Sequence, residues 1–260
     1  MLRRWCILLA MLALTVGTAV AASSASAATT SAGRLVPGGT VHLVGARAQA
    51  RGISNQANST NWSGYAATTG TYTSVSASWT QPTGTCSGGD QYAAFWVGLD
   101  GYGSSTVEQT GSDVDCVAGT AQYYAWYEMY PSTSVNYADT VQAGDHITAS
   151  VTYTGNDEFS LAIADTTQGW SHTTTKSQAG AARSSAEVIV EAPCCTAHGA
   201  TVSLTNFDTV SFTSSAADGS ALGSAAGLAQ ITMVDGSGGA KDSISPISGG
   251  NFSVSWVSSG

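Results

Sequence analysis

Two glutamates lie on one face of a predicted strand. Residues 186–191 read AEVIVE, a β-branched run typical of an extended strand. Side chains alternate between the two faces of a strand, so Glu187 and Glu191 share one face with Ile189, while the two valines point into a core. Only 10% of this chain is charged, so a pair of carboxylates on one strand face needs a chemical or a structural explanation.

Aromatic, amide and further carboxylate side chains occupy three other predicted strands. Taken singly, a Trp on a strand is more often packing than a substrate platform, and a glutamine is usually polar filling. Together, these residues would line a concave sheet face that suits a bound polymer. The residues that alternation places on such faces are Trp96, Gly98 and Asp100 in 95–100, Gln109 in 106–111, and Trp126 and Glu128 in 124–130.

Several other kinds of catalytic centre lack their sequence signatures. Gly-x-Ser-x-Gly does not occur, and His146 and His172 have no nucleophile signature beside them, which disfavours a serine triad. Asp-Thr-Gly and Asp-Ser-Gly pairs of the aspartic-protease kind, EF-hands, HExxH and phosphate loops are also missing. We therefore expect neither a metal nor a cofactor.

The N-terminus predicts export. Arg3 and Arg4 precede an apolar run over residues 6–20, and small residues at 25–27 form a cleavage site, so residues 1–27 are interpreted as a signal peptide. No later stretch is long and apolar enough to span a bilayer. We expect a secreted, extracellular protein that is not held at a membrane once the signal is removed.

The charge of the chain divides at about residue 58. Residues 28–57 are small and polar, contain arginines and no acid, and are interpreted as a propeptide or linker. From Asn58 onward the basic residues are only Lys176, Arg183 and Lys241, against all 17 Asp and Glu of the chain. Nucleic acid is excluded as a partner, because phosphate binding needs a basic surface. The division suggests that the basic segment inhibits an acidic site until its carboxylates protonate; a merely soluble, secreted surface is the alternative.

Cysteine usage agrees with an oxidising compartment. Cys6 leaves with the signal, so four cysteines remain, which allow three pairings into two disulfides. We favour Cys86 with Cys116, which would tie the two ends of one strand pair and leave Cys194 and Cys195 as a vicinal bridge. A zinc site from Cys194, Cys195 and His198 is disfavoured, because adjacent cysteines are poor tetrahedral ligands.

From Asn61 onward the chain reads as β structure throughout. The regular spacing of the strands predicts one domain over residues 58–260, an antiparallel β-sandwich, with a barrel as the second choice. Residues 220–229 are the only helix candidate. The expected strands include 72–80, 92–99, 106–109, 122–130, 146–154, 159–165, 187–191, 209–213, 229–234 and 252–257.

Six segments, in order, resemble the glutamic peptidases, or eqolisins. They are NWSG at 61–64, FWVGLD at 95–100, QTG at 109–111, AWYEMYP at 125–131, AEVIVE at 186–191 and AQIT at 229–232. The resemblance implies a concanavalin A-like sandwich of two roughly seven-stranded sheets and an acid endopeptidase with a Gln/Glu dyad. It puts the glutamine at Gln109 and the glutamate at Glu191, and it makes Trp96, Asp100, Trp126 and Glu128 substrate-binding positions. Tyr124 departs from the aspartate of fungal members.

The chemistry of these residue types suits hydrolysis of polypeptides. A carboxylate such as Glu191 can take a proton from a water that attacks a peptide carbonyl and return it to the departing amine. The amide of Gln109 can donate a hydrogen bond to the oxyanion that develops. We expect polypeptide substrates, an acidic pH optimum and a monomer.

A secreted glycoside hydrolase or carbohydrate-binding module is the alternative function. Four residues along one strand separate the Cα atoms of Glu187 and Glu191 by about 13 Å. Their side chains could converge toward the spacing of about 5–5.5 Å of a retaining pair. Glucanases of this architecture tend to carry an aspartate between such glutamates, whereas this chain has Ile189. A non-catalytic surface domain, in which Gln109 and Glu191 share no site, is a third reading.

Overall fold

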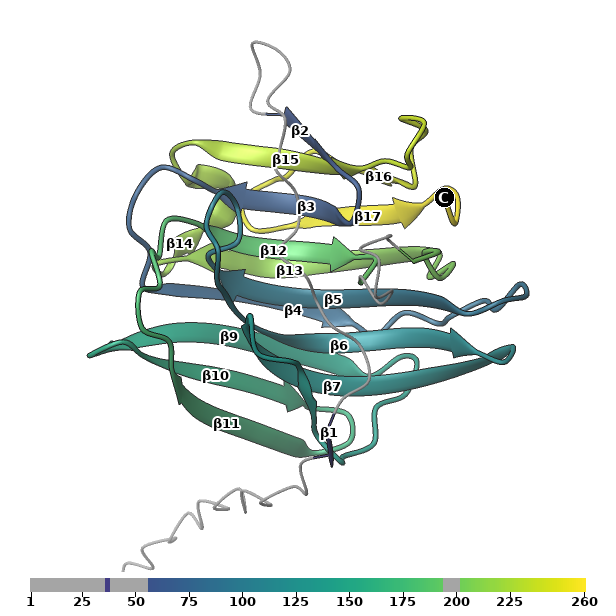
Figure 1. Cartoon of the computed structure of the whole chain (residues 1–260), viewed down its shortest axis with the longest axis horizontal. Helices are drawn as coiled ribbons and strands as arrows, with labels where there is room; N and C mark the ends of the chain where they lie inside the picture. Colours follow the sequence, from purple (N-terminus) through teal and green to yellow (C-terminus); the bar gives the residue numbers. More distant parts are fainter. Residues whose placement is uncertain (1–35, 38–55, 194–201) are drawn as a thin grey trace, which may run out of the picture.

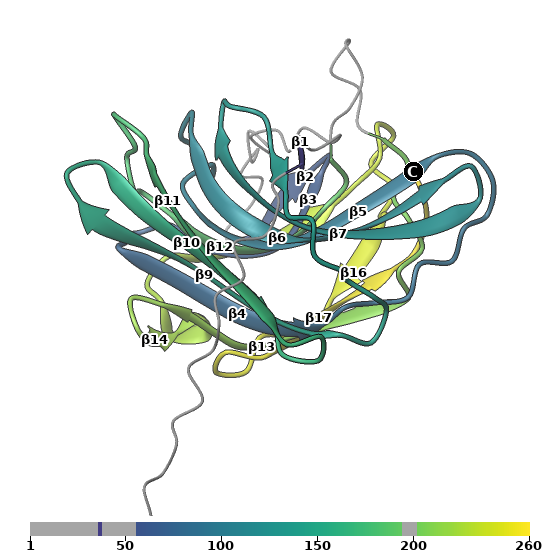
Figure 2. The same cartoon turned by 90° about the horizontal axis from the view of Figure 1, so that it is seen from below.

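Two antiparallel-rich β-sheets stacked face to face form the protein (Figures 1 and 2). The computed structural model describes residues 36–37, 56–193 and 202–260. Within these residues, no helix is long and apolar enough to cross a membrane. The predicted β-sandwich is confirmed.

The first sheet has the strand order β1-β8-β7-β6-β5-β12-β3-β15-β2. Two of its nine strands, β1 and β8, are two residues long, so its longer strands match the roughly seven that were expected. The bounds in chain order are β1 (Val36–Pro37), β2 (Gln56–Ser59), β3 (Trp62–Ala67), β5 (Gln91–Leu99), β6 (Val107–Val117), β7 (Thr120–Tyr130), β8 (Val135–Asn136), β12 (Ala186–Glu191) and β15 (Leu228–Met233).

The second sheet has the order β11-β10-β9-β4-β13-β17-β16, and β14 pairs with β13 beside this path. Figure 2 shows the two sheets nested, with the first sheet bent so that its outward side is hollow. This side is called the hollow face below. The bounds are β4 (Ser74–Thr80), β9 (His146–Gly155), β10 (Glu158–Asp165), β11 (Trp170–Ser177), β13 (Thr209–Ala217), β14 (Ser220–Ala221), β16 (Asp242–Ile244) and β17 (Phe252–Trp256).

Alternation along the strands builds the core between the sheets. On β12 the two valines belong to the main apolar cluster, whereas Ile189 belongs to a second cluster with Trp62, Trp96 and Trp126 on the hollow face. On β9 and β10, buried residues alternate with partly exposed ones, which is the pattern of a sheet with one solvated face. The first sheet is therefore buried on both faces, and its hollow face carries polar as well as apolar side chains.

Most predicted strands are present, and two expectations need correction. Residues 62–67 form β3 and residues 170–177 form β11, and neither range was among the expected strands. β6 extends to Val117 rather than ending at Gln109. The stretch 220–229, expected to hold at most a turn or two of helix, contains β14, a single 3₁₀ turn at Leu222–Ser224 and the start of β15.

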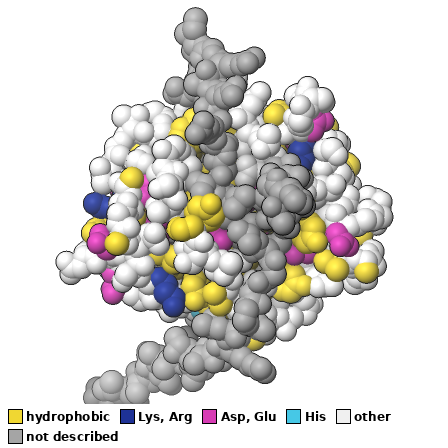
Figure 3. Space-filling view, in the orientation of Figure 1, with side chains coloured by type: hydrophobic (Ala, Val, Ile, Leu, Met, Phe, Trp, Pro, Cys, Tyr) yellow, Lys and Arg dark blue, Asp and Glu magenta, His cyan; other side chains and the backbone are white. Residues whose placement is uncertain are grey.

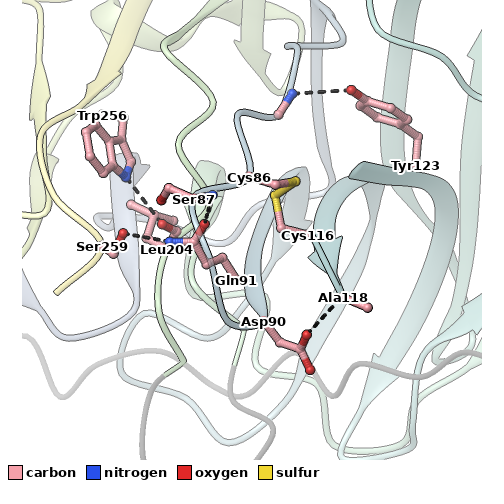
Figure 4. Close-up of a disulfide and its surroundings, with 11 residues drawn as sticks. Cys86, Ser87, Asp90, Gln91, Cys116, Ala118, Tyr123, Leu204, Trp256 and Ser259 are labelled. Atoms are coloured by element: carbon pink, nitrogen blue, oxygen red, sulfur yellow. Dashed lines mark hydrogen bonds between the residues drawn. A yellow bond between two sulfur atoms is a disulfide. The ribbon is translucent and has the colours of Figure 1, made fainter. Parts of the chain in front are cut away.

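The Cys86–Cys116 disulfide is confirmed (Figure 4). It ties the segment before β5 to the end of β6, and hydrogen bonds such as that from the Ala118 N–H to Asp90 surround it. Cys194, Cys195 and His198 lie outside the described residues, so the vicinal bridge and the zinc alternative are not addressed by the structure.

Charged side chains are sparse on the visible surface, where Figure 3 shows them scattered among uncharged ones. Two of the three basic residues that follow Asn58 lie against aromatic rings: Lys176 over Tyr127 and Arg183 over Tyr153. Within the described residues one ion pair is present, between His172 and Asp139. This one pair contributes little to the stability of the described part of the chain.

Candidate active site

Strand pairing arranges the hollow-face side chains in rows that cross the strands. One row holds Glu187, Gly98, Gln109 and Glu128, from β12 across β5 and β6 to β7. The next holds Ile189, Trp96, Gly111 and Trp126. The third runs from Trp62 on β3 through Glu191, Ala94 and Asp113 to Tyr124. All of the predicted site residues on these strands therefore lie on one face.

Gln109 and Glu191 lie on either side of β5. Gln109 pairs with Gly98, and Glu191 pairs with Ala94, four residues farther along that strand. In a flat sheet this offset would separate the two Cα atoms by about 10 Å across and about 13 Å along the strands. The two side chains thus face a common space beside Trp96 rather than each other directly.

Two neutral donors hold the carboxylate of Glu191. Nε1 of Trp96 donates to Oε2 at 2.9 Å, and Nδ2 of Asn61 donates to Oε1 at 3.3 Å. Asn61 is itself oriented by the Ser59 hydroxyl, which donates to its Oδ1 at 3.1 Å. All four side chains are buried. Each carboxylate oxygen therefore has a fixed direction, as a group that must meet a water requires.

The amide of Gln109 is held from one side. Its Nε2 donates to Oε2 of Glu128 at 2.6 Å, and its buried Oε1 has no hydrogen-bond partner. Gly98 beside it has no side chain to crowd the amide. A Cβ at this position would lie 3.2 Å from Cβ of Gln109 and 2.9 Å from the ring of Trp96. One end of the amide is thus satisfied, and the other is open to a further group.

Indole rings pack around this space. Trp62 and Trp96 meet edge to face with ring centroids 4.8 Å apart, and Nε1 of Trp126 donates to Oδ1 of Asp113 at 2.6 Å. Gly111 makes room for Trp96, since a Cβ there would lie 2.2 Å from the carbonyl oxygen of Phe95 and 2.5 Å from Cβ of Trp96. Nε1 of Trp62 is buried without a hydrogen bond. The site is therefore walled by rigid rings with few free donors.

Glu187 differs from Glu191 in its surroundings. Both of its oxygens are buried without a hydrogen bond of good geometry, and burial raises the pKa of Glu187 well above its ordinary value. The charges of Asp100 and Glu108 add to this rise, and weaker contacts with Ser185 and the Tyr102 N–H oppose it. Glu108 lies on the opposite side of the sheet, next to Leu99 and Met129, and burial raises its pKa to about 8. These two carboxyls are therefore neutral in acid, and neither resembles an ionised nucleophile of a sugar hydrolase.

Asp100 serves the backbone of a neighbouring loop. Its carboxylate accepts hydrogen bonds from the N–H groups of Arg183 and Ser184 at 2.6 and 2.9 Å, and the Ser184 hydroxyl donates to it at 3.1 Å. This loop leads directly into β12 and so fixes the strand that carries Glu191. The predicted contact of Asp100 with substrate stays a prediction.

Three residues of the site were not assigned a role from the sequence. Asn61 and Trp62 stand in the NWSG segment, and Asp113 stands two residues beyond Gly111 on the Gln109 face of β6. The alternation that grouped Gln109 with Val107 could have found Asp113, had the strand been extended past 109. Tyr124, the departure from the fungal pattern, lies opposite Asp113 and donates to Oε1 of Gln122.

The features typical of other sites lie elsewhere. A depression of about 350 Å³ lies on the second sheet, among β4, β9, β10 and β11, and is lined by small side chains such as Ser76 and Thr148. No group of His, Cys, Asp and Glu that could hold a metal occurs within the described residues. The hollow face of the first sheet is therefore the candidate active site.

Comparison with known proteins was made by sequence and by structure. Residues 60–256 match the model of the peptidase A4 family. Aspergillopepsin-2 of Aspergillus niger is 30% identical over 208 residues, which cover 71% of this chain and 72% of that protein. Scytalidopepsin B of Scytalidium lignicola is 34% identical over 137 residues, about half of each chain (50% and 51%).

Two solved structures share the fold. A scytalido-glutamic peptidase with a transition-state analogue inhibitor has a TM-score of 0.64 and 27% identity, covering 76% of this chain and 98% of that one. The aspergilloglutamic peptidase of Aspergillus niger has a TM-score of 0.56 and 28% identity, covering 64% of this chain and 99% of that one.

Proposed function

Because this chain belongs to the peptidase A4 family, the eqolisins or glutamic peptidases, and is thus a hydrolase of peptide bonds, we propose that it is a secreted acid endopeptidase whose dyad is Gln109 and Glu191. One observation carries the choice of residues. Glu191 is the hollow-face carboxylate with both oxygens held by neutral donors, and it faces the space next to the open amide of Gln109.

Glu191 acts first as a base and then as an acid. Its carboxylate takes a proton from a water, which attacks the carbonyl carbon of the scissile peptide, and then returns that proton to the departing amine. Trp96 and Asn61 keep the carboxylate oriented through both transfers. Gln109 donates an N–H to the oxyanion of the tetrahedral intermediate. These steps form no covalent bond between enzyme and substrate.

An acidic optimum follows from the neighbouring carboxyls. Glu187 and Glu108 have raised pKa values, so both carboxyls are uncharged in acid and the sheet then holds no buried charge at either position. As the pH rises these groups ionise, and buried charges destabilise the sheet that carries the dyad. Activity is therefore expected to be highest in acid and to fall toward neutrality.

The substrate is an extended segment of a polypeptide that lies along the hollow face. Trp96, Trp126 and Glu128 are its proposed contacts, with the edges of the indole rings as apolar walls. Relatives were crystallised with a peptide-based transition-state analogue and with the tripeptide Ala-Ile-His, which supports a peptide as occupant. The chain works as a monomer and needs no cofactor in this scheme.

Residues 1–27 are proposed to direct secretion, and residues 28–57 to act as an inhibitory propeptide. The described parts of residues 36–59 support an association with the first sheet: β1 pairs with β8 near one edge and β2 pairs with β15 near the other. β2 begins at Gln56, two residues before the proposed boundary of the mature domain. Addition of a synthetic 28–57 peptide to the acid-activated protein near neutrality tests the inhibition; unchanged activity would contradict it.

Cleavage of a denatured protein by the full-length chain from pH 2 to 7 tests the proposed function. We expect cleavage at internal peptide bonds in acid, insensitive to pepstatin, with Glu191→Gln at least about 10²-fold slower. Glu158→Gln, at an exposed position of β10, is the matched control and should keep full activity. A folded Glu191→Gln variant with wild-type activity would refute the assignment.

A further inference from the structure

The side chain that touches Gln109 is itself able to gain or lose a proton. Nε2 of Gln109 donates to Oε2 of Glu128 at 2.6 Å, and both residues are fully buried. A carboxylate can only accept hydrogen bonds, so it must face the N–H end of an amide. A carboxylic acid has an O–H to donate, and its best partner on the amide is the oxygen.

From this geometry we propose that Glu128 is a positioning residue whose protonation turns the amide of Gln109 toward the substrate. With Glu128 ionised, one of the two N–H groups of Nε2 is held by its carboxylate, and the amide oxygen, rather than the second N–H, faces the reaction space. With Glu128 protonated, its O–H donates to Oε1, and Nε2 is released to donate to the oxyanion. The inference rests on the proposed function, because it assumes that Gln109 stabilises that oxyanion.

The surroundings of Gln109 allow this rotation. Its Oε1 has no hydrogen bond to lose, and Gly98 on the adjacent strand puts no side chain against it. The amide of a glutamine is planar, and its oxygen and nitrogen ends have nearly the same shape, so an exchange of the two requires no repacking. The hydrogen bond to Glu128 is thus the interaction that selects between the two orientations.

The three basic residues that follow Asn58 make contacts of their own within the described structure. Lys176 and Arg183 lie over the rings of Tyr127 and Tyr153, and Lys241 donates to the carbonyl of Val202. β8, which pairs with β7, contributes only Val135 and Asn136. The titratable groups on the hollow face nearby are Glu187 beyond Gly98, Tyr130 on the same strand, Tyr102 in the same apolar cluster, and Asp113 and Tyr124 two rows away.

The consequence is a limit on activity at its upper pH end. Loss of the proton from Glu128 withdraws the donor of Gln109 even where Glu191 is a fully competent base. The lost hydrogen bond acts on the transition state, so kcat should fall by a larger factor than KM changes. A merely structural Glu128 would not separate these two constants in this way.

The test uses the side-chain amide signal of Gln109 in ¹⁵N NMR spectra of the full-length protein, assigned by its loss in Gln109→Ala. In the wild type the signal should shift with pH along a titration. In Glu128→Gln, where the partner no longer titrates, that shift should vanish. Glu187→Gln removes the other carboxyl of the row and should leave the titration in place. This readout needs no activity, so it stands apart from the test of the proposed function.

Kinetics supply the second readout, taken only at pH values where circular dichroism shows a folded protein. Glu128→Gln can donate an N–H to Oε1 at every pH, so the upper limb of its kcat profile should move up by about one pH unit or more. An unmoved limb, an equal shift in Glu187→Gln, or a persisting Gln109 titration in Glu128→Gln would overturn the proposal. So would a folded Glu128→Gln that is inactive at every pH, because Glu128 would then take part in the chemistry itself.

Discussion

The hollow face of the first sheet and the outer face of the second are both turned away from the core, yet they carry different chemistry. On the second sheet, β4 and β9 present small hydroxyl side chains such as Ser76, Ser78, Thr148 and Ser150, all partly exposed. On the first, β12 and nearly all of β6 are buried on both sides, although they carry glutamate, glutamine and aspartate.

This difference separates a solvated surface from a functional one. Ser and Thr on a strand satisfy their hydrogen bonds with water at little cost, so a solvated sheet face needs nothing more specific. Burying a carboxyl or an amide costs free energy unless it is hydrogen-bonded, and Glu187 and Oε1 of Gln109 are not. Polar groups that are kept buried and incompletely paired on one face indicate a role beyond folding.

Among substitutions on the two sheet faces, replacement of Gln109 should reduce peptide cleavage the most. Gln109→Ala removes the donor to the oxyanion, and we expect kcat to fall by about 10²–10³-fold. Gln122→Ala, on the same face of β7 but outside the three rows, is the matched control and should stay near wild-type activity. Steady-state cleavage of a quenched fluorescent peptide in acid measures kcat for both variants. Equal losses of kcat in the two variants would contradict a specific catalytic role for Gln109.

Buried carboxyls of the first sheet should also control stability. Burial raises the pKa of Glu108 to about 8, so the folded state binds its proton more tightly than the unfolded state does. Its contribution is therefore fully present below about pH 4.3, the unfolded value, and is lost as the pH rises to about 8. We expect the free energy of unfolding to decrease by about 2–4 kcal/mol over this range from this group alone.

Urea unfolding at pH 4, 6 and 8 measures this dependence. Glu108→Gln should be less dependent on pH than the wild type, whereas Glu158→Gln, exposed on the second sheet, should follow the wild type. Some dependence should remain in Glu108→Gln, because burial also raises the pKa of Asp242 to about 7. If Glu108→Gln left the pH dependence of the free energy of unfolding unchanged, Glu108 would not be the source of that dependence.

Loss of a hydrogen-bond donor to Glu191 should have a smaller effect on activity. Trp96→Phe keeps an aromatic ring but removes the N–H that binds Oε2, and kcat should fall by about tenfold with little change in KM. Asn61→Ala should cost less, because its hydrogen bond is longer (3.3 against 2.9 Å). A larger loss in Asn61→Ala than in Trp96→Phe would reverse this ranking of the two donors.

The smallest effect should come from the outer face of the second sheet. Ser76→Ala and Thr148→Ala each remove a partly exposed hydroxyl, and each should change the free energy of unfolding by no more than about 0.5 kcal/mol. Neither should alter peptide cleavage. A loss of activity in either variant would show that the two faces are not separate in function.

Much of this arrangement was predictable from local pattern. The alternation in AEVIVE correctly assigned the glutamates and the valines to opposite faces of β12. The Cys86–Cys116 pairing followed from cysteine arithmetic and strand order. β11 was missed because its run of Ser, Thr, His and Lys has few of the apolar residues that mark a strand.

The rows of side chains in the site could not be predicted from the sequence, because they depend on the register between strands. Nothing local shows that Gln109 stands opposite Glu128, or that Glu191 stands opposite Trp62; these pairings are set by three or four strands together. The same holds for Asp100, whose sequence position suggested the site but whose carboxylate binds the backbone before β12. The fold was thus more accessible to sequence reasoning than the contacts within it.

The most direct test of the dyad is a double-mutant cycle on kcat/KM for peptide cleavage, with Gln109→Ala, Glu191→Gln and the double variant. If the two side chains act on one reacting group, the double variant should lose hardly more than the worse single variant. Losses that add in full would mean that Gln109 and Glu191 act independently, and this would contradict a shared site.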